Sequence, residues 1–354
     1  MRVLVERMLM PHVYVGLNMA EPRLEVLELK FRHTISPRIP LLRKSPRLGS
    51  GVLHCSFSLE RGEILGLVGA NGAGKTTLLR LIAGILQRQG GEIRIEGKQV
   101  TTVQLRSIIG HMPEHVRWSG SRTPLEIIEE FCTLSHQPTK SAKNIIKLVG
   151  LSAQIHEPLH RLSQGMRQRL SLGVALIGSP DILLLDEPFN GLDPIASASF
   201  QTLLKSLQKK GVTIIVSSHL VHDLSQLVDR IAIMHRGQLV EEGTMAEVSS
   251  RLGFSDLYRI QGKGAFDIEM HFEDEQVIEY TQSKEEWSAL VRGATQNTLQ
   301  SILGSGASII SWAPYEPSLV DLLRSATGLE LEEMSLEVSS QIMVPLREDG
   351  DEDE

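Results

Sequence analysis

The sequence predicts an α/β fold: a mixed sheet core with a helical subdomain, followed by a small C-terminal α+β accessory domain. Three observations predict the core. The apolar run 64–68 leads through a glycine-rich stretch, 69–77, into a helix-forming segment, 78–83. The run 182–185 is continuously apolar, as buried strands of parallel sheets are, and it ends in Asp186 and Glu187. The run 212–216 repeats this pattern before Ser217.

The glycine-rich stretch matches G-x-x-x-x-G-K-[ST] between a strand and a helix, which is the context that gives this pattern its meaning. Its backbone N–H groups would turn inward at the positive end of the helix and form a nest for phosphate. The lysine would reach the outer phosphates, and the first threonine hydroxyl would bind Mg²⁺. The residues expected to hold a nucleotide are Gly69, Asn71, Gly72, Ala73, Gly74, Lys75, Thr76 and Thr77.

Composition and charge describe an ordinary globular chain. Its 354 residues suffice for two domains, with 41% apolar and 22% charged residues. The formal charge is −7, but residues 348–354 carry six carboxylates, so the rest is close to neutral and nucleic acid is not an expected partner. The two cysteines offer no disulfide framework, and no apolar run reaches the about 18 residues of a membrane span.

The two ends differ from this average. Residues 1–20 are predicted to be an N-terminal extension without the layout of a signal peptide. Met19 would make a natural start, which leaves two alternatives: the extension is translated, or translation begins at Met19 and the extension is not made. Residues 345–354 are predicted to be an acidic, disordered tail.

The core is predicted over residues 21–252 and begins with two alternating strands, 24–31 and 52–59. Between them, residues 34–50 contain three prolines and four basic residues but no acid, which predicts a surface loop. This insertion is compatible with a simple solvated loop or with a contact to anionic lipid or a partner. Shorter strands are predicted at 91–98 and 108–114.

A helical section and the remaining strands follow. Thr123, Pro124 and Glu126 have the spacing of a capping box, which predicts a helix to about residue 134, and another helix is predicted at 141–149. Ser163 is expected to cap a third helix and Asp193 a fourth. A hairpin at 231–240 and a capping box that starts at residue 244 complete the core.

The accessory domain is predicted over residues 253–344. Alternation predicts strands at 266–272 and 277–280, which would pair with each other. Ser283 and Glu286 predict a capped helix whose apolar residues at 287, 290, 291 and 294 have helical spacing. A strand at 308–312 and a short helix at 317–325 follow. No catalytic grouping stands out in this section.

Further landmarks follow the phosphate loop: Leu-Ser-x-Gly at 162–165, Asp-Glu-Pro at 186–188, Gly-Leu-Asp at 191–193 and a histidine at 219. With them, residues 24–252 resemble the nucleotide-binding subunit of the ATP-binding cassette (ABC) transporter family. The resemblance implies a P-loop NTPase fold, ATP and Mg²⁺ as cofactors, and ATP hydrolysis. It implies that Asp186 holds Mg²⁺ with Thr76, that Glu187 is the general base, and that Lys75 and His219 contact the γ-phosphate.

The same resemblance implies two kinds of partner. Two cassettes would close around two ATP molecules, with Ser163 and Gly165 on the γ-phosphate bound to the second subunit and Asp193 acting across the interface. The second cassette is expected to be a copy of this chain. A separate membrane-spanning permease would be received in a groove formed by residues 114–125, where Trp118 either lines the groove or anchors the core.

The sequence departs from the family pattern in three respects. Gln164 and Met166 replace the more usual glycine and glutamine of the signature. Glu114 stands where many relatives carry a glutamine that senses Mg²⁺ and the partner, so the resemblance implies a sensor role. A carboxylate there would bind Mg²⁺ but would also repel the γ-phosphate. The aromatic residue that stacks on adenine is either Phe31 or His33, and Phe31 equally suits the core.

Together these features predict the ATP-hydrolysing subunit of an export-type transporter, peripheral on the cytoplasmic face of the cell membrane. By analogy only, the accessory domain would be regulatory or support the dimer. The alternative is a soluble, ATP-switched protein of the same family that acts on ribosomes or DNA. The single phosphate loop, and the lack of a heptad run between Lys75 and Ser163, argue against it. A third interpretation is a regulatory cassette that binds ATP but barely hydrolyses it.

Overall fold

The computed structural model describes residues 21–35, 47–218, 224–264, 266–283, 285–304 and 308–328. The predicted extension 1–20, the acidic tail 345–354 and His219 lie outside the described residues, as does the predicted accessory domain beyond residue 328.

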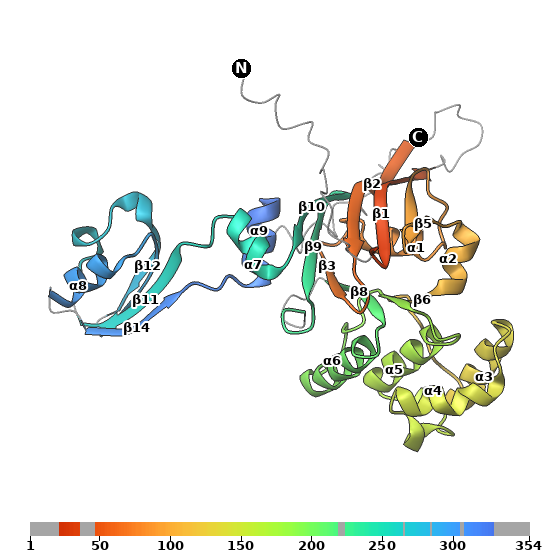
Figure 1. The fold of residues 1–354 in the computed structure, drawn as a ribbon. Coiled ribbons are helices and arrows are strands. Elements are labelled where there is room, and N and C mark those ends of the chain that lie inside the picture. Colours follow the sequence, from red (N-terminus) through yellow and green to blue (C-terminus); the bar gives the residue numbers. More distant parts are fainter. Residues whose placement is uncertain are drawn as a thin grey trace, which may run out of the picture.

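The predicted mixed sheet is confirmed: ten strands form one sheet at the centre of the larger part of the molecule (Figure 1). Five strands are parallel, in the order β9-β3-β8-β7-β6, and β10 joins them to an antiparallel edge built from β2, β1, β4 and β5. The strands are β1 (Leu24–Ile35), β2 (Arg47–Leu59), β3 (Ile64–Val68), β4 (Gly90–Ile95), β5 (Lys98–Gln99), β6 (Ile109–Met112), β7 (Ile182–Leu185), β8 (Thr213–Ser218), β9 (Arg230–His235) and β10 (Gln238–Gly243).

Helices cover both faces of the parallel strands, which is why those strands are continuously apolar. Leu183 and Leu185 of β7 pack into one hydrophobic cluster with α3 (Pro124–Leu134), α4 (Ala142–Leu148), α5 (Gln164–Ala175) and α6 (Pro194–Gln208). Ile182 and Leu184 face the other cluster, with α1 (Lys75–Ile82) and α2 (Thr102–Ile108). Figure 1 shows α3, α4 and α5 as a separate helical group beside the sheet. Short 3₁₀ turns at Thr139–Ser141, Ser152–Gln154 and Leu159–Arg161 connect these helices.

Four of the predicted helix starts, all within residues 21–252, are confirmed. Thr123 opens a full capping box at α3, and Thr244 opens another at α7 (Met245–Arg251). The side chains of Ser163 and Asp193 accept hydrogen bonds from backbone N–H groups three residues further on, at the starts of α5 and α6. Such caps join residues that are close in sequence, so the sequence alone reveals them. The capping box that Thr101 forms at α2 was not predicted.

The predicted loop at 34–50 is wrong at both ends. β1 continues to Ile35 and β2 begins at Arg47, and the two strands still pair there, with residues 34 and 35 opposite 48 and 47. Cross-strand hydrogen bonds extend this hairpin beyond the alternating segments that predicted it. The three prolines of the insertion fall in residues 36–46, outside the described residues, so none of them interrupts the paired segments.

A second, four-stranded antiparallel sheet follows, in the order β12-β13-β11-β14, and the helix predicted after Ser283 is wrong. That segment is the inner strand β13 (Glu286–Arg292), between β12 (Val277–Gln282) and β11 (Leu257–Lys263). Trp287, Ala289 and Val291 face one cluster with a period of two. Strand partners on both sides satisfy the backbone of β13, and this pairing outweighs the helical spacing.

Other differences concern the neighbours of that strand. The strand predicted at 266–272 is wrong, because this segment contains the 3₁₀ turn Ile268–Met270, and β12 pairs with β13 instead. A second 3₁₀ turn, Asp274–Gln276, precedes β12. β11 and α8 (Gln296–Gly304) were not predicted, whereas the strand β14 (Ser308–Pro314) was.

The predicted last helix is confirmed as α9 (Leu319–Thr327), and it packs against the larger part of the molecule. Leu319, Leu322 and Leu323 are buried in the same cluster as α3 to α6. Figure 1 shows the result: α9 lies beside α7, while α8 and β12 lie at the far end of the long strands β11 and β14. Within the described ranges, no helix is long and apolar enough to cross a membrane.

Candidate active site

The phosphate loop runs from the end of β3 to the start of α1 and lines a pocket of about 230 Å³. Gly74, the residue before α1, has a φ of +107°. A Cβ atom at this position would lie 2.8 Å from the carbonyl oxygen of Gly51, so only glycine allows the loop to approach β2 this closely. The predicted residues from Asn71 to Thr77 all line the pocket, together with Ala70, Ser50, Gly51, Glu114 and Glu187.

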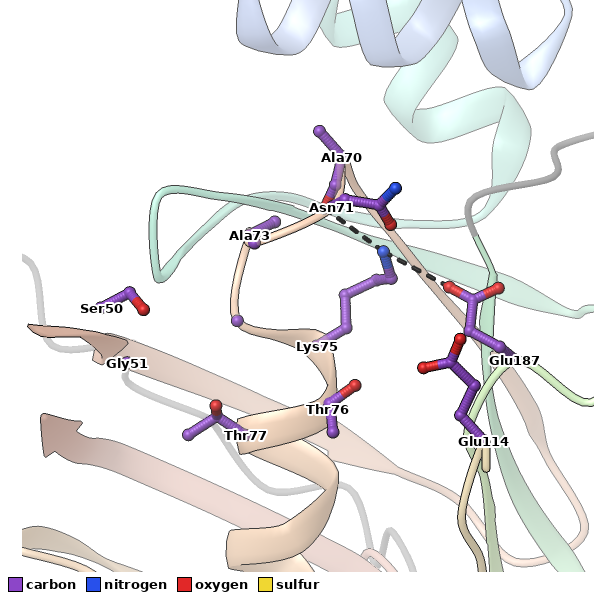
Figure 2. Close-up of a pocket in the computed structure, with 12 residues that line it drawn as sticks. Ser50, Gly51, Ala70, Asn71, Ala73, Lys75, Thr76, Thr77, Glu114 and Glu187 are labelled. Atoms are coloured by element: carbon purple, nitrogen blue, oxygen red, sulfur yellow. Dashed lines mark hydrogen bonds and ion pairs between the residues drawn. The ribbon is translucent and has the colours of Figure 1, made fainter. Parts of the chain in front are cut away.

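Lys75 is the buried cation of this pocket, with a relative exposure of 6%. Its Nζ donates hydrogen bonds to the carbonyl oxygens of Gly69, at 2.6 Å, and Ala70, at 3.3 Å. The same atom lies 3.5 Å from Oε1 of Glu187 (Figure 2). Burial lowers the pKa of the Lys75 ammonium from its ordinary value of 10.5, although the surrounding carboxylates, Glu187 most of all, act in the opposite direction.

Two acidic residues follow β7 at its carboxyl end. Asp186 is 1% exposed and Glu187 is 6% exposed. The Asp186 backbone N–H donates to the carbonyl oxygen of Met112, at 2.9 Å, which ties the strand end to β6. Glu187 has a φ of +49°, an uncommon conformation for a residue with a side chain. A non-glycine residue is held there only when its surroundings fix it.

Ser217 at the end of β8 supplies that fixation, and sequence reasoning missed it. Its hydroxyl donates to Oδ1 of Asp186, at 2.7 Å, and accepts a hydrogen bond from the backbone N–H of Glu187, at 2.9 Å. The side chain is fully buried. The only signal in the sequence was that β8 ends beside β7 in a parallel sheet, where the carboxyl ends of strands meet.

Glu114 and Thr76 complete the oxygen groups of the pocket. Figure 2 shows the carboxylates of Glu114 and Glu187 on the same side of the pocket, facing the Lys75 ammonium. Asp186 is buried and does not line the pocket. Hydroxyl and carboxylate oxygens are the ligands that Mg²⁺ prefers. Within the described ranges, no group of three His, Cys, Asp or Glu side chains is placed to hold a metal ion.

The two aromatic candidates differ in their surroundings. Phe31 packs against the hydrophobic cluster around α1. Nε2 of His33 lies 3.4 Å from Oγ1 of Thr77, and its ring meets Phe31 edge-on, with centroids 4.9 Å apart. His33 is therefore the candidate next to the phosphate loop, and Phe31 contributes to the core.

Ser163, Gly165 and Asp193 form a second group outside the phosphate pocket. A Cβ atom at Gly165 would lie 3.2 Å from Cβ of Ala196, so the first turn of α5 lies against the first turn of α6. The side chains of Ser163 and Asp193 cap their helices. Within one chain, the predicted site residues therefore fall into two groups: one lines the phosphate pocket, and the other lies at the starts of α5 and α6.

Trp118 belongs to the core. Its Nε1 donates to Oγ of Ser171 on α5, at 2.7 Å, and its ring packs edge-on against Phe131. Of its two proposed roles, the anchoring contact is the one observed. His219, the remaining candidate, follows directly after β8 but lies outside the described residues.

A phosphate loop whose lysine faces a carboxylate at the end of another parallel strand of the same sheet defines a P-loop nucleoside triphosphatase. Residues 52–190 match the family model for the ABC transporter. An uncharacterised ABC transporter ATP-binding protein of Synechocystis is 32% identical over 276 residues, which cover 75% of each chain. The chain belongs to the ATP-binding proteins of ABC transporters, and it is an ATP-binding, ATP-hydrolysing subunit of that family.

Two relatives carry more specific names. The linearmycin resistance ATP-binding protein LnrL of Bacillus subtilis is 29% identical over 78% of this chain and 93% of its own. The bacitracin transport ATP-binding protein BcrA of Bacillus licheniformis is 32% identical over 62% of this chain and 74% of its own.

The fold agrees with solved cassettes. One is the dimeric structure of an ATP-binding cassette in a post-hydrolysis state with ADP and Pi. It superimposes with a TM-score of 0.54 and 21% identity over 62% of this chain and 98% of that chain. At this identity the likeness concerns the fold.

Proposed function

We propose that this subunit powers export, working as a pair of identical cassettes on the cytoplasmic face of a membrane-spanning permease. The match to a resistance protein over nearly its full length supports the direction. The relatives described above act in transport or resistance, and nothing in them favours the alternative of a soluble switch on ribosomes or DNA.

ATP would bind with its outer phosphates in the loop, where the backbone N–H groups and Lys75 meet them. Phosphate oxygens would then replace the carbonyl groups that now accept hydrogen bonds from Lys75. Mg²⁺ would be held by the Thr76 hydroxyl, with Asp186 behind it and Glu114 at the side of the pocket. When bound, Mg²⁺ neutralises charge on the phosphates during their transfer.

Glu187 would act as the general base on the attacking water. The observation that carries this assignment is its position: it is 6% exposed, lines the phosphate pocket and faces Lys75 at 3.5 Å. A base must lie within reach of the water beside the γ-phosphate, and Lys75 is the residue that marks this place. Glu187 is also rigid, because Ser217 holds its backbone. His219 is assigned to the γ-phosphate by the resemblance alone.

A second cassette would complete the site. Ser163, at the start of α5, is exposed and lies outside the phosphate pocket of its own chain. A helix N-terminus with a hydroxyl suits an anion, and the phosphates of a partner chain are the anion that the family resemblance suggests. Gly165 lets the first turn of α5 approach Ala196 of α6, the residue whose N–H donates to the side chain of Asp193.

The permease would contact the segment 114–125, between β6 and α3. Trp118 anchors this segment on α5 through Ser171. Movement of the segment by the permease would therefore act on α5, whose first residues would meet the phosphates of the second cassette. Glu114 at one end of the segment also lines the nucleotide pocket, so nucleotide and permease would share one element.

The test is purification of Glu187→Gln protein with ATP from native membranes in mild detergent, with mass spectrometry of what accompanies it. We expect a polytopic membrane protein and a second copy of this chain. Turnover should fall at least about 100-fold while ATP binding persists, because the base is lost and the phosphate loop is intact. Glu269→Gln, at an exposed position far from the pocket, is the control. Recovery with ribosomes or DNA from the soluble fraction would contradict the proposal.

A further inference from the structure

The second sheet has two different faces. Ala289 and Val291 of β13 pack into the cluster that α8 also joins. Leu290, between them, points to the opposite face, because side chains alternate along a strand. Leu257 of β11 lies on that opposite face too, since its neighbour Tyr258 packs against the same cluster as Ala289. Both leucines are 4% exposed, yet neither belongs to any of the three hydrophobic clusters of the described ranges.

The two leucines line a cavity of about 400 Å³, and residues of α9 form another part of its lining. Phe254 and Ile278 add further apolar side chains to this lining. Ile278, on the edge strand β12, is 47% exposed. Figure 1 shows α9 where β11 and β14 leave the larger part of the molecule. The cavity is therefore a partly apolar space at the junction of the cassette and the second sheet.

Tyr315 holds the elements around this cavity together. Its backbone N–H donates to the carbonyl oxygen of Leu257, and its hydroxyl donates to Oδ2 of Asp321 on α9, both at 2.8 Å. The guanidinium carbon of Arg259 lies 5.2 Å from the centre of the Tyr315 ring. Nη2 of Arg259 also lies 3.4 Å from Oε2 of Glu279 on β12. These contacts connect β11, β12 and α9, so the cavity is built into the fold.

The described part of the chain ends at this cavity. Gly328, which follows α9, lines the cavity and has a φ of +68°. This left-handed conformation ends a helix and turns the chain away from the helix axis. The next sixteen residues, 329–344, read LELEEMSLEVSSQIMV; eight of them are apolar, and none is proline, glycine or basic. The sequence also predicts that the accessory domain extends to residue 344.

We propose that the segment 329–344 folds back into this cavity and fastens the second sheet to the cassette with its apolar side chains. The segment is joined directly to Gly328, so its effective concentration at the cavity is of the order of millimolar. A second copy of the chain, which has no such tether, competes at its much lower concentration in solution. The proposal does not depend on ATP binding.

The test is the reactivity of an introduced thiol in the full chain. Both native cysteines are buried, so Ile278→Cys provides one accessible thiol at the cavity. Ile310→Cys, at a 56% exposed position on the other edge strand, provides the reference. With N-ethylmaleimide, the thiol at position 278 should react at least about tenfold more slowly, because it reacts only while the segment is released. The combined change Met334→Asp, Leu336→Asp and Val338→Asp should raise its rate to that of the reference.

The matched control adds the same charges without removing an apolar side chain. Ser335→Asp, Ser339→Asp and Ser340→Asp together should preserve the slow reaction at position 278. Equal rates for the two thiols in the unchanged segment would mean that the cavity is open. Slow reaction that survives loss of the three apolar residues would mean that something else covers it, a second copy if the protection increases with protein concentration. Loss of protection in both triple variants would make charge the cause. Each of these results overturns the proposal.

Discussion

Ser217→Ala is the most informative single change at the catalytic end of the sheet. The hydroxyl makes two hydrogen bonds in a fully buried place, one to the Asp186 carboxylate and one from the Glu187 backbone. Alanine fits the same space but leaves a buried charge and a buried N–H group without this partner. A hydrogen bond to a charged group contributes about 2 kcal/mol and a neutral one about 1 kcal/mol, so we expect a loss of about 3 kcal/mol.

Two measurements follow from that magnitude. For a unit of this size, each 1 kcal/mol lowers the melting temperature by about 3 °C, so Tm should fall by about 10 °C. The Glu187 backbone also loses the hydrogen bond that holds it at its positive φ, which contributes about 1 kcal/mol. If this energy is lost from the transition state, kcat should fall about fivefold at temperatures well below Tm. KM for ATP should change little, because the phosphate loop is untouched.

Ser206→Ala is the matched control. Its hydroxyl donates to the carbonyl oxygen of Leu203 within α6, at 2.7 Å, and touches neither acidic residue. We expect a Tm shift below about 2 °C for this variant and an unchanged kcat, since surface and local helix changes are small. A Ser217→Ala protein with the parent Tm and kcat would refute the bridging role. A lower Tm with the parent kcat would refute its part in positioning Glu187.

Three further changes test other parts of the molecule. Glu114→Gln should retain nucleotide binding, measured by calorimetry, because the loop and Lys75 remain; complete loss of binding would contradict the sensor role given to this side chain. Leu322→Ala should lower the stability of the cassette by about 3 kcal/mol in thermal unfolding, because this residue of α9 is fully buried in its cluster. Leu303→Ala, at an exposed position on α8, is the control and should have little effect. Equal effects of the two changes would argue against docking of α9. Without nucleotide, the buried Lys75 has a pKa below its ordinary value of 10.5. Folding therefore favours the neutral form of this side chain. The nucleotide-free protein should gain stability as the pH rises from the lowered pKa towards 10.5. The negative phosphates of ATP would raise the Lys75 pKa again, so ATP binding should take up protons between the lowered pKa and pH 10.5. Calorimetry in buffers of different ionisation enthalpy would detect this uptake. Binding that does not depend on pH in this range would contradict the prediction.

The sequence by itself determined the phosphate loop, the buried strand that ends in Asp186 and Glu187, and the starts of four helices at Thr123, Ser163, Asp193 and Thr244. These features depend on interactions between residues that are close in the chain. A capping box spans three residues, and a glycine-rich turn is recognised from its own spacing. The family resemblance rests on the same short motifs, and it led to the right class of protein.

Only the tertiary structure decided which segments pair across long distances. Residues 286–292 have apolar positions that suit a helix or a strand, and the strands on either side selected the strand. The return of α9 to the larger part of the molecule and the support of Asp186 and Glu187 by Ser217 from another strand depend on the packing of residues far apart in the chain. Such contacts form when non-local backbone pairing and burial outweigh local preference, and no short stretch of sequence contains both partners.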